Sequence, residues 1–355
     1  MKRIDLTLLS SVVFLTLFGL FMVYDASSFV AFRDFFDKYH YVKGQAVWVI
    51  IGLLSLSFFS YFDYKKLYNL SLPILLTAIV LLIMVFIPGI GVYALGARRW
   101  INLGFFVLQP AEFVKLALAI YLASWLSHKE KGRLAAFLML LGLIVALVML
   151  EPDMGTTVVI LLEAIIVYFL SGGSMLYFSI ILPLSAILGY FLIRLSSYRL
   201  KRLETFFNID QPIADFSYHV RQILIALGSG GIFGVGLGNS LQKYAYLPES
   251  TTDSIFAIIA EELGFLGAVL IVGLFAVVIW RGFIIAVKAK DTFGKLLAGG
   301  IITFLGTQAL INLSAQTILI PLTGIPLPFI SYGGSALIVD LCAVGILLNI
   351  SRQST

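Results

Sequence analysis

A short acidic segment before a long apolar run contains the side chains best suited to proton chemistry. Glu249 and Asp253 flank three hydroxyl-bearing residues, and the apolar run begins at about Ser254. Such side chains accept hydrogen bonds from the free N–H groups at a helix start, so some of them should cap the helix. The helix is apolar enough to enter a bilayer, which places Asp253 at the edge of the hydrocarbon, where carboxylates are costly and commonly functional. Two roles are therefore open for Asp253, a helix N-cap and a base that abstracts a proton.

Two more groups of polar residues lie within apolar runs. Glu112 and Lys115 are three residues apart at the start of one run, so they share a helix face and are predicted to form an ion pair. The pair could simply hold a helix end, but buried ion pairs seldom gain stability over apolar packing, which favours a functional role. Gln308, Asn312 and Gln316 recur every four residues and could serve only to join helices through hydrogen bonds.

Cations, carboxylates and a tryptophan also fall in or beside glycine-rich segments between the apolar runs. Cations beside exposed backbone N–H groups suit a phosphate or a pyrophosphate, and a carboxylate at the membrane edge suits proton abstraction. A lipid-linked substrate that carries phosphate would need both. From the residues alone, this pattern favours either an enzyme or a lipid-binding transporter. The residues of this set are Lys43, Arg98, Arg99, Trp100, Asp153, Lys243 and Glu249.

The composition places the chain in a membrane. Of its 355 residues, 60% are hydrophobic and 12% are charged, and the mean hydropathy is +1.03. An ordinary soluble domain has about twice that charged fraction, so the polar residues are too few to cover a water-facing surface. The net charge of +5 comes without a basic block, which argues against a nucleic-acid partner. The single cysteine excludes an intramolecular disulfide, and the three widely separated histidines argue against a structural zinc site.

The apolar runs predict an all-α polytopic membrane protein with about ten transmembrane helices in a single domain, residues 1–355. Asp340 lies inside the last run, and the sequence indicates no partner for its carboxylate. The longest predicted loops are 25–43, 88–110 and the extracytoplasmic segment 194–253 between spans seven and eight. The glycine-rich second half of this last loop is expected at the membrane interface or within the protein at membrane depth. The spans are expected at about 6–24, 45–61, 71–87, from 111, 134–150, 156–170, 175–193, 254–280, 297–320 and 336–350.

Lys and Arg residues gather in the short loops on one side of the predicted spans. They are more frequent at the N-terminus and in the 63–66, 128–133 and 281–295 connections than in the alternate short loops. The positive-inside rule therefore places both termini in the cytoplasm. Asp153, Glu249 and Asp253 are then expected to face the outside.

Several short motifs are spread over nearly the whole chain. They are GARRWINL (96–103), QPAEFVK (109–115), PDMGT (152–156), LPE with TD (247–249 and 252–253), EELG (261–264) and PLTGIPLPFISYGGS (321–335). One motif alone would be weak, but the ordered set closely resembles the SEDS family of bacterial proteins, whose main branches are FtsW and RodA. The segment GLGNSLQK (236–243) is similar to the FtsW branch.

The resemblance implies a peptidoglycan glycosyltransferase of the bacterial cytoplasmic membrane, acting on its outer face in cell division or cell shape. It would join lipid II units into glycan strands, working with a class B penicillin-binding protein and other division or elongation proteins. The family's catalytic aspartate maps onto Asp253, which as general base would deprotonate the 4-hydroxyl of the acceptor sugar. Undecaprenyl pyrophosphate would leave from C1 of the donor, its charge stabilised by cationic residues or by a divalent ion, Mg²⁺ or Mn²⁺. The residues expected to bind substrate or support the site are Lys43, Gln45, Arg98, Arg99, Trp100, Gln109, Glu112, Lys115, Asp153, Asn239, Lys243 and Glu249.

Four positions depart from the family's pattern. The motif's histidine and phenylalanine are Thr251 and Ser254, the glutamine before Pro152 is Glu151, and a cation near the start of span two is Gly44. A lipid II flippase or another lipid transporter stays open as an alternative, and so does a division scaffold. A flippase predicts polar groups at the membrane midplane, whereas most of the informative ones here fall on the outer side.

Overall fold

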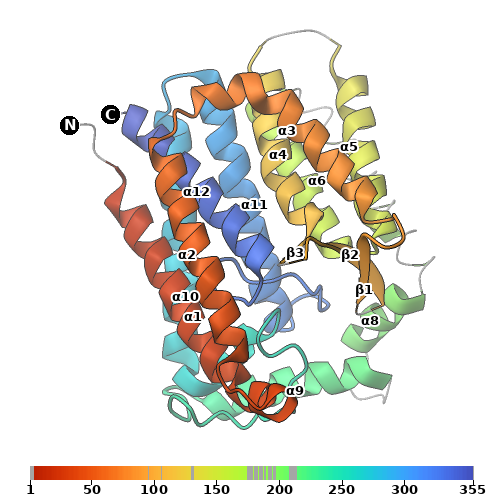
Figure 1. The fold of residues 1–355 in the computed structure, drawn as a ribbon, viewed down its shortest axis with the longest axis vertical. Coiled ribbons are helices and arrows are strands. Elements are labelled where there is room, and N and C mark those ends of the chain that lie inside the picture. Colours follow the sequence, from red (N-terminus) through yellow and green to blue (C-terminus); the bar gives the residue numbers. More distant parts are fainter. Residues whose placement is uncertain are drawn as a thin grey trace.

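The computed structural model describes residues 4–354 except 95, 105, 129–131, 174–178, 180–182, 184–186, 188, 191–193, 195–196 and 208–213. The described part is mostly helical, with long helices side by side and α9 lying across one end (Figure 1). The elements are α1 (Leu6–Phe35), α2 (His40–Tyr61), α3 (Lys65–Met84), β1 (Gly91–Ala94), β2 (Ala97–Asn102), β3 (Val107–Leu108), α4 (Pro110–Leu126), α5 (Leu134–Leu150), α6 (Met154–Leu170), α8 (Ser197–Phe207), α9 (Ala214–Gly230), α10 (Ile255–Lys288), α11 (Thr292–Gln316) and α12 (Gly334–Ser354).

Six of the described helices, α1, α2, α3, α10, α11 and α12, are long and apolar enough to cross a membrane. Two shorter apolar helices, α5 and α6, accompany them. In their most apolar stretches, 78% of the residues of α11 and α12 are buried, against 22% in α2 and α10. The helices α11 and α12 therefore form the centre of the bundle, and α2 and α10 expose apolar side chains as lipid-facing helices do. This is a polytopic membrane protein.

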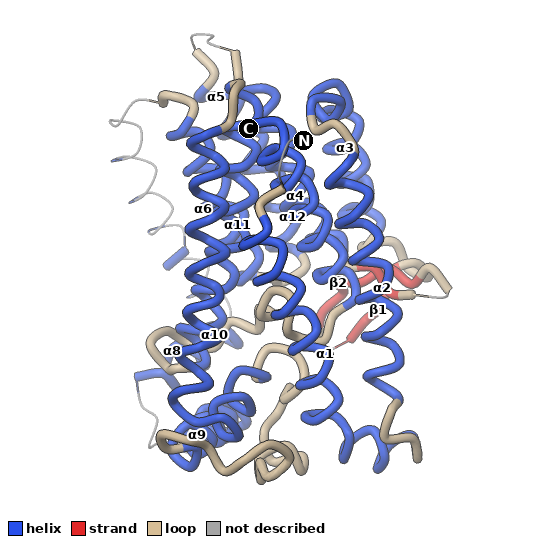
Figure 2. The backbone as a smooth tube through the Cα atoms, turned by 90° about the vertical axis from the view of Figure 1, so that its left-hand side faces the viewer, coloured by secondary structure: helices blue, strands red, loops and turns tan. Residues whose placement is uncertain are grey.

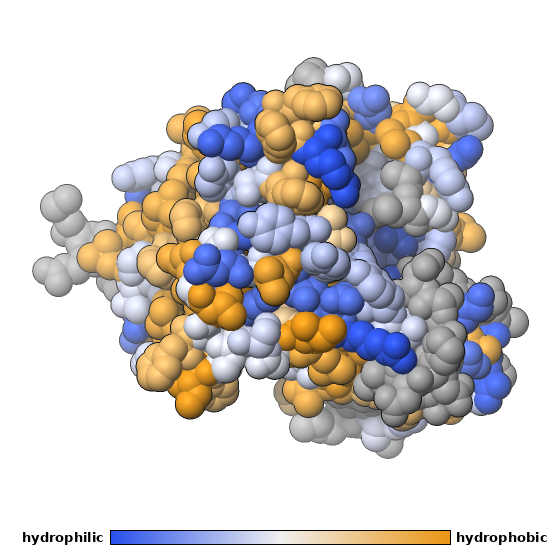
Figure 3. Space-filling model, turned by 90° about the horizontal axis from the view of Figure 1, so that it is seen from below, coloured by the Kyte–Doolittle hydropathy of each residue, from blue (hydrophilic) through white to orange (hydrophobic). Residues whose placement is uncertain are grey.

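The two ends of the bundle differ in what they carry. The start of α1 and the end of α12 lie together at one end (Figure 1). The helices α8 and α9 lie at the other end, and the strands are displaced toward it (Figures 1 and 2). Seen from that end, hydrophilic side chains occupy much of the middle of the face, with hydrophobic ones around much of its rim (Figure 3). We call this the α8–α9 end.

The predicted loop 25–43 is wrong for most of its length, because α1 continues to Phe35. The stretch 25–35 contains no glycine or proline, so nothing interrupts the helical hydrogen bonds where the apolar run ends. The helix ends at Phe36, whose φ of 56° is left-handed and whose N–H donates to the carbonyl of Phe32.

Two other predicted loops contain regular structure. Residues 88–110 include an antiparallel sheet of order β1-β2-β3, so the expectation of an all-α protein is corrected to a mostly helical one. The turn at Gly96, with φ of 79°, lets β1 and β2 pair their backbone groups as a hairpin. The loop 194–253 includes α8 and α9, both with one apolar and one polar side. The predicted span at 175–193 lies largely outside the described residues.

The helix α10 is interrupted at Gly264, where φ is 68° and ψ is −167°. The chain after α9 fills the break. The N–H groups of Val235 and Gly236 donate to the carbonyls of Glu261 and Glu262, each at 3.0 Å. The N–H groups of residues 265 and 266 donate in turn to the carbonyls of residues 231 and 232. These bonds satisfy the backbone groups that the break leaves free, as an interruption within a membrane helix requires.

Candidate active site

The acidic segment 249–254 is held by the loop that joins α11 to α12. The N–H of Tyr332 donates to the carbonyl of Thr251 at 2.8 Å, and the Ser331 hydroxyl donates to the carbonyl of Thr252 at 2.5 Å. These two bonds join segments that are about eighty residues apart in the sequence. The side chains of Thr252 and Asp253 are therefore carried on backbone that a second loop fixes in place.

On α11, the polar stripe formed by Gln308, Asn312 and Gln316 supports the acidic segment and the α11–α12 loop. The Asn312 side chain donates from Nδ2 to the carbonyl of Asp253 at 2.9 Å and to that of Ile325 at 2.7 Å. One turn earlier, Gln308 donates to the carbonyl of Pro326 at 3.1 Å. Both amides are buried. The stripe thus positions the α11–α12 loop and the backbone of Asp253, rather than only joining helices.

The Asp253 carboxylate does not cap α10, which corrects that interpretation. Ser254 occupies the N-cap position, and no side chain there bonds to the helix. The Asp253 Oδ1 atom instead accepts from the Thr252 hydroxyl at 3.2 Å, and the same hydroxyl lies 2.8 Å from Glu249 Oε2. Burial and the charge of Glu249 raise the pKa of Asp253 to about 6. Asp253 can therefore accept and release a proton near neutral pH.

A guanidinium from α8 completes the surroundings of Asp253. Arg202 donates from Nη1 to the carbonyl of Leu322 at 2.9 Å. A Cβ atom at Gly324 would lie 3.8 Å from Asp253 Oδ2 and 3.9 Å from Arg202 Nη1, so both charged groups lie beside this glycine. Gly324 has φ of 74°, which favours glycine. The positive charge of Arg202 partly offsets the rise in the pKa of Asp253.

Two further arginines lie near this site. Arg99 on β2 donates to the carbonyls of Glu151 at 3.0 Å and Pro152 at 2.8 Å, at the turn between α5 and α6. Arg199, one turn before Arg202 on α8, is close enough to Arg99 that burial and this second cation lower its pKa. Burial and Asp153 raise the pKa of Glu151 to about 9. Arg99 and Arg199 are thus neighbours, and Arg199 shares one face of α8 with Arg202.

Asp153 and Gln109 lie at the starts of two neighbouring helices. Asp153 caps α6, because its carboxylate accepts from the N–H of Thr156 at 3.0 Å and from its hydroxyl at 2.9 Å. The Gln109 side chain donates to Asp153 at 3.4 Å, and the Gln109 N–H donates to the Ser335 hydroxyl at 3.1 Å. These two residues support the start of α4, α6 and α12, and Asp153 is nearly buried.

Gln45 also supports the α11–α12 loop. It is buried on α2, donates to the carbonyl of Ser331 at 3.2 Å and accepts from the N–H of Gly333 at 3.3 Å. Ser331 is the residue that bonds to the acidic segment. The amide of Gln45 is therefore two hydrogen bonds away from the backbone of Thr252.

The ion pair predicted from the spacing of Glu112 and Lys115 is present. The two charged groups are 2.7 Å apart, and each side chain is 1% exposed. Lys115 also donates a hydrogen bond to Gln308, which holds Pro326. Because Lys115 is enclosed, it supports the loop beside Asp253 and does not reach the α8–α9 end.

Lys243 lies apart from Asp253, in a buried cluster of its own. Its ammonium group is 2.9 Å from Asp25 on α1 and 2.9 Å from Glu262 on α10. The hydrogen bonds to these two carboxylates outweigh burial and raise the pKa of Lys243. Lys243 lies in the loop from α9 to α10 and joins this loop to α1 and α10. It therefore supports the fold of the loop.

The remaining predicted site residues lie toward the surface. Lys43 is exposed and paired with Asp37 at 2.7 Å. Arg98 is exposed on β2, and Trp100 on the same strand is half-buried. Asn239 is exposed and donates to the carbonyl of Val235 at 3.1 Å. The structure brings none of these four into contact with Asp253.

A histidine contacts the residue next to Asp253. His219 on α9 lies with Nε2 2.8 Å from the Ser254 hydroxyl, which is fully buried. Burial and the charge of Arg202 lower the pKa of His219 to about 4, so the imidazole is neutral at physiological pH. Ser254 is one of the positions that depart from the family motif, and here its hydroxyl connects the acidic segment to α9.

The sequence does not single out Arg199, Arg202 and His219, because its pattern predicts a loop at 194–253. The available signal was amphipathic periodicity. Arg199 and Arg202 are three residues apart in a charged segment and share one helix face once that segment is helical. Periodicity would not have shown which side of α8 meets Asp253.

Metal-binding residues are sparse in the described part of the chain. No group of three or more His, Cys, Asp and Glu side chains there has the arrangement of a metal site. Glu249 and Asp253 supply two carboxylates that share one hydroxyl donor. Such a pair could bind a hard cation only if other oxygen ligands came from substrate or water.

Fold and site together define a multi-pass membrane protein with a carboxylate and several arginines at one end of its helices. The family model described as "Cell cycle protein", that of the FtsW, RodA and SpoVE proteins, matches residues 6–355. The chain belongs to this FtsW/RodA/SpoVE family.

Relatives and solved structures agree with this assignment. The chain is 41% identical to stage V sporulation protein E of Bacillus subtilis, over 99% of this chain and 97% of that protein. It is 39% identical to a probable peptidoglycan glycosyltransferase FtsW of Geobacter, over 99% of both. A chain from a peptidoglycan synthase complex that coordinates polymerization and crosslinking superposes with a TM-score of 0.82 at 26% identity, over 100% of this chain and 99% of that one. RodA of Thermus thermophilus superposes with a TM-score of 0.71 at 26% identity, over 99% of this chain and 97% of that one.

Proposed function

We propose that this chain is a peptidoglycan glycosyltransferase that polymerises lipid II on the outer face of the bacterial cytoplasmic membrane. The Asp253 carboxylate takes the proton of the acceptor 4-hydroxyl, and the acceptor oxygen forms a bond to C1 of the donor sugar. The bond from C1 to the pyrophosphate oxygen breaks, and undecaprenyl pyrophosphate leaves with that electron pair. The observation that carries this proposal is the raised pKa of Asp253, about 6, beside Arg202.

The arginines supply the charge that the leaving group needs. Arg202 lies near Asp253, Arg199 is one turn before Arg202 on α8, and Arg99 on β2 is close to Arg199. Guanidinium groups bind phosphate oxygens in a bidentate manner and stabilise the negative charge that develops on a departing pyrophosphate. In this proposal Arg202 is nearest to the reacting centre, and Glu249 and Thr252 orient Asp253.

Apolar side chains next to Arg202 line a small pocket, at which the lipid part of the substrate would begin. Its lining includes Phe206, Val220, Ile318, Ile320 and Leu322, together with Arg202 itself. An isoprenoid chain attached to a pyrophosphate requires an apolar surface directly beside a cation. The α8–α9 end offers both, which supports a lipid-linked pyrophosphate as the leaving group.

We further propose about ten spans, with both termini in the cytoplasm and the segment 194–253 outside. The bias of Lys and Arg supports this orientation. In a chain with Cys342 replaced by alanine, Glu204→Cys should react with an impermeant thiol reagent from outside, and Lys66→Cys only after the membrane is opened. Both positions are exposed. Equal labelling of both from outside would overturn the topology.

A class B penicillin-binding protein is the proposed partner, because a related chain is part of a synthase complex for polymerization and crosslinking. A divalent ion, Mg²⁺ or Mn²⁺, is proposed as an optional ligand of Glu249 and Asp253. It would neutralise pyrophosphate charge when bound, with substrate oxygens as its other ligands.

A lipid transporter is the second candidate. The buried ionisable groups of α4, α6 and α12, Glu112, Lys115, Glu163 and Asp340, favour it, because transport requires polar groups at membrane depth.

One experiment separates the two functions. Purified chain in detergent is supplied with lipid II, so that no membrane has to be crossed, with and without a co-expressed class B penicillin-binding protein. We expect glycan strands on a gel in the presence of the partner. Complete absence of strands under both conditions, together with lipid II movement in vesicles, would favour the transporter.

A further inference from the structure

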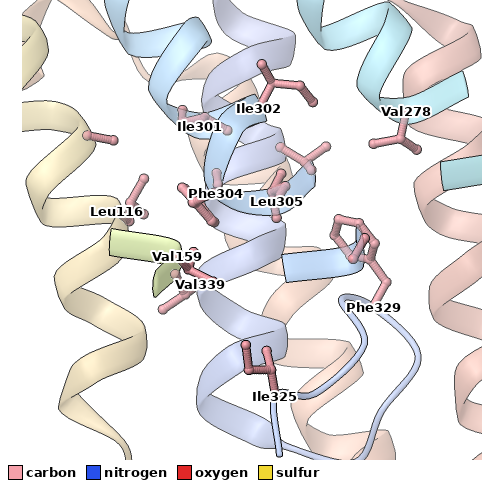
Figure 4. Close-up of a cluster of buried hydrophobic side chains, with 14 of the residues drawn as sticks. Leu116, Val159, Val278, Ile301, Ile302, Phe304, Leu305, Ile325, Phe329 and Val339 are labelled. Atoms are coloured by element: carbon pink, nitrogen blue, oxygen red, sulfur yellow. The ribbon is translucent and has the colours of Figure 1, made fainter. Parts of the chain in front are cut away.

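Four ionisable side chains meet in the interior of the helical bundle. Glu112 and Lys115 come from α4, Glu163 comes from α6 and Asp340 comes from α12. The residues are 1%, 1%, 0% and 0% exposed, in that order. Figure 4 shows part of the apolar core, where Leu116, Val159 and Val339 of these three helices lie close to Phe304 of α11.

The cluster has three carboxyl groups and one cation. The Lys115 ammonium forms an ion pair with Glu112 at 2.7 Å and donates a hydrogen bond to Gln308. The Lys115 charge interacts with both Glu163 and Asp340, but neither of these lies within ion-pairing distance of it. Both oxygens of Glu163 and both of Asp340 lack a hydrogen-bond partner among the described residues. A fully ionised cluster would therefore carry two uncompensated negative charges in the interior.

No other described charge neutralises them. The helix α5 contains no charged residue. On the other helices that pack against α4, α6 and α12, the buried Glu261 accepts hydrogen bonds from Ser229 and Ser240, and the other charged side chains are exposed or paired with an opposite charge. The latter are Asp5 with Arg281, Asp25 and Glu262 with Lys243, Arg33 with Asp34, Lys43 with Asp37, and the exposed Lys65, Lys66, Lys288 and Lys295.

We propose that Glu163 and Asp340 are neutral carboxylic acids, and that they form a proton-binding site in the membrane interior beside Lys115. An unpaired carboxylate in such surroundings costs far more than a neutral acid, and binding a proton removes that cost. The ligand is a proton rather than a metal ion, because two carboxyl groups supply too few oxygen ligands for a hard cation. In addition, the described acids lack the arrangement of a metal site.

The site distinguishes Glu112 from the other two acids. Glu112 is ionised because its partner is the ammonium of Lys115, whereas Glu163 and Asp340 each carry their own proton. An amide has the shape of a neutral acid and no charge. Glu163→Gln and Asp340→Asn should therefore leave the yield of folded protein unchanged, and Glu112→Gln should reduce it several-fold by leaving Lys115 unpaired.

Infrared spectroscopy of the full chain in detergent at pH 7 tests the proposal directly. The carbonyl stretch of a neutral carboxylic acid is separate from that of a carboxylate. We expect Glu163→Gln and Asp340→Asn each to remove one acid band from the wild-type spectrum, and Glu112→Gln to remove none. Acid bands that are identical in the wild type and in both amide variants would overturn the proposal.

Reaction with dicyclohexylcarbodiimide gives an independent readout. The oxygen of a neutral carboxylic acid adds to the central carbon of this apolar reagent, and the acid proton moves to one reagent nitrogen. The acyl group then migrates to the other nitrogen and gives a stable acylurea, so no leaving group is released. We expect mass spectrometry to find adducts at Glu163 and Asp340 in folded wild-type protein. Adducts that are lost on adding sodium chloride but not choline chloride would mean that sodium, rather than a proton, occupies the site, which would contradict the proposal.

Discussion

Asp253 and Glu163 are both carboxyl groups in an apolar protein, but their surroundings differ in kind. Asp253 lies on irregular backbone at the α8–α9 end, with a hydroxyl donor and Arg202 within reach. Glu163 lies within the regular helix α6, fully buried and without a hydrogen-bond donor in the described part of the chain. The comparison shows that irregular backbone brings a hydroxyl donor and a cation near Asp253, whereas α6 buries Glu163 without a donor in the described part of the chain.

The polar stripe of α11 connects the two regions. Gln308 contacts Lys115 in the interior and Pro326 in the α11–α12 loop, and Asn312 one turn later contacts the backbone of Asp253. The rigid centre thus sets the position of the irregular end. Changes in the interior should act mainly on folding, and changes at the α8–α9 end should act mainly on rate.

The largest effect is expected from Lys115→Met. The change leaves Glu112 buried without its partner, which typically costs about 3–5 kcal/mol of folding free energy. Thermal unfolding in detergent should show a clear loss of stability. Lys43→Met is the matched control, because that exposed ion pair contributes about 1 kcal/mol or less. Equal unfolding temperatures for the two variants would contradict a structural role for Lys115.

Arg202→Ala should lower the polymerisation rate about 10²–10³-fold while folding is nearly retained. The reason is that the leaving pyrophosphate loses its nearest proposed cation. The rate is measured as glycan product per unit time at saturating lipid II. Arg98→Ala is the control from the exposed side of β2 and should keep most of the activity. A similar loss in both variants would place the pyrophosphate elsewhere.

Acidification should lower the rate about tenfold between pH 7 and pH 5. Asp253 acts in its ionised form and has a pKa of about 6, so the active fraction falls as pH drops through that value. His219, with a pKa of about 4, stays neutral over this range. The rate at pH 5 and pH 7 is compared at saturating substrate. A rate that rises on acidification would exclude Asp253 as the base.

The smallest effects are expected at the bond between His219 and Ser254. Removing either partner should lower kcat several-fold, in line with about 1 kcal/mol for one hydrogen bond, and leave KM nearly unchanged. His219→Ala and Ser254→Ala should lose no more together than singly, because they break the same contact. Additive losses would show that the two residues act independently.

Sequence reasoning located much of the fold and part of the site. The bounds predicted for the fifth apolar helix match α5 to the residue, and those for the sixth nearly match α6, because each apolar run is bounded by charged or turn residues. The Glu112–Lys115 pair followed from helical spacing alone. The extension of α1 to Phe35 was missed, because hydrophobicity marks the membrane and not the end of a helix.

The rest depends on tertiary contacts that spacing does not encode. Lys243 was grouped with the substrate-binding cations, but Asp25 and Glu262 enclose it. The sequence does not single out Arg202, although its guanidinium and the Asp253 carboxylate both lie beside Gly324. Asp253 was also open to a capping role, which the geometry at Ser254 removes. Each of these outcomes is set by which loop lies against which helix.

The most direct test compares Asp253→Asn with Glu249→Gln in the purified, partner-bound protein supplied with lipid II. Both changes remove one negative charge from the same segment and keep the side-chain shape. We predict that Asp253→Asn lowers the rate of glycan-strand formation about 10²–10⁴-fold, as loss of a general base does, while folding and partner binding persist. Glu249→Gln should keep substantial activity. Glycan strands made by Asp253→Asn at nearly the wild-type rate would contradict the catalytic role of Asp253.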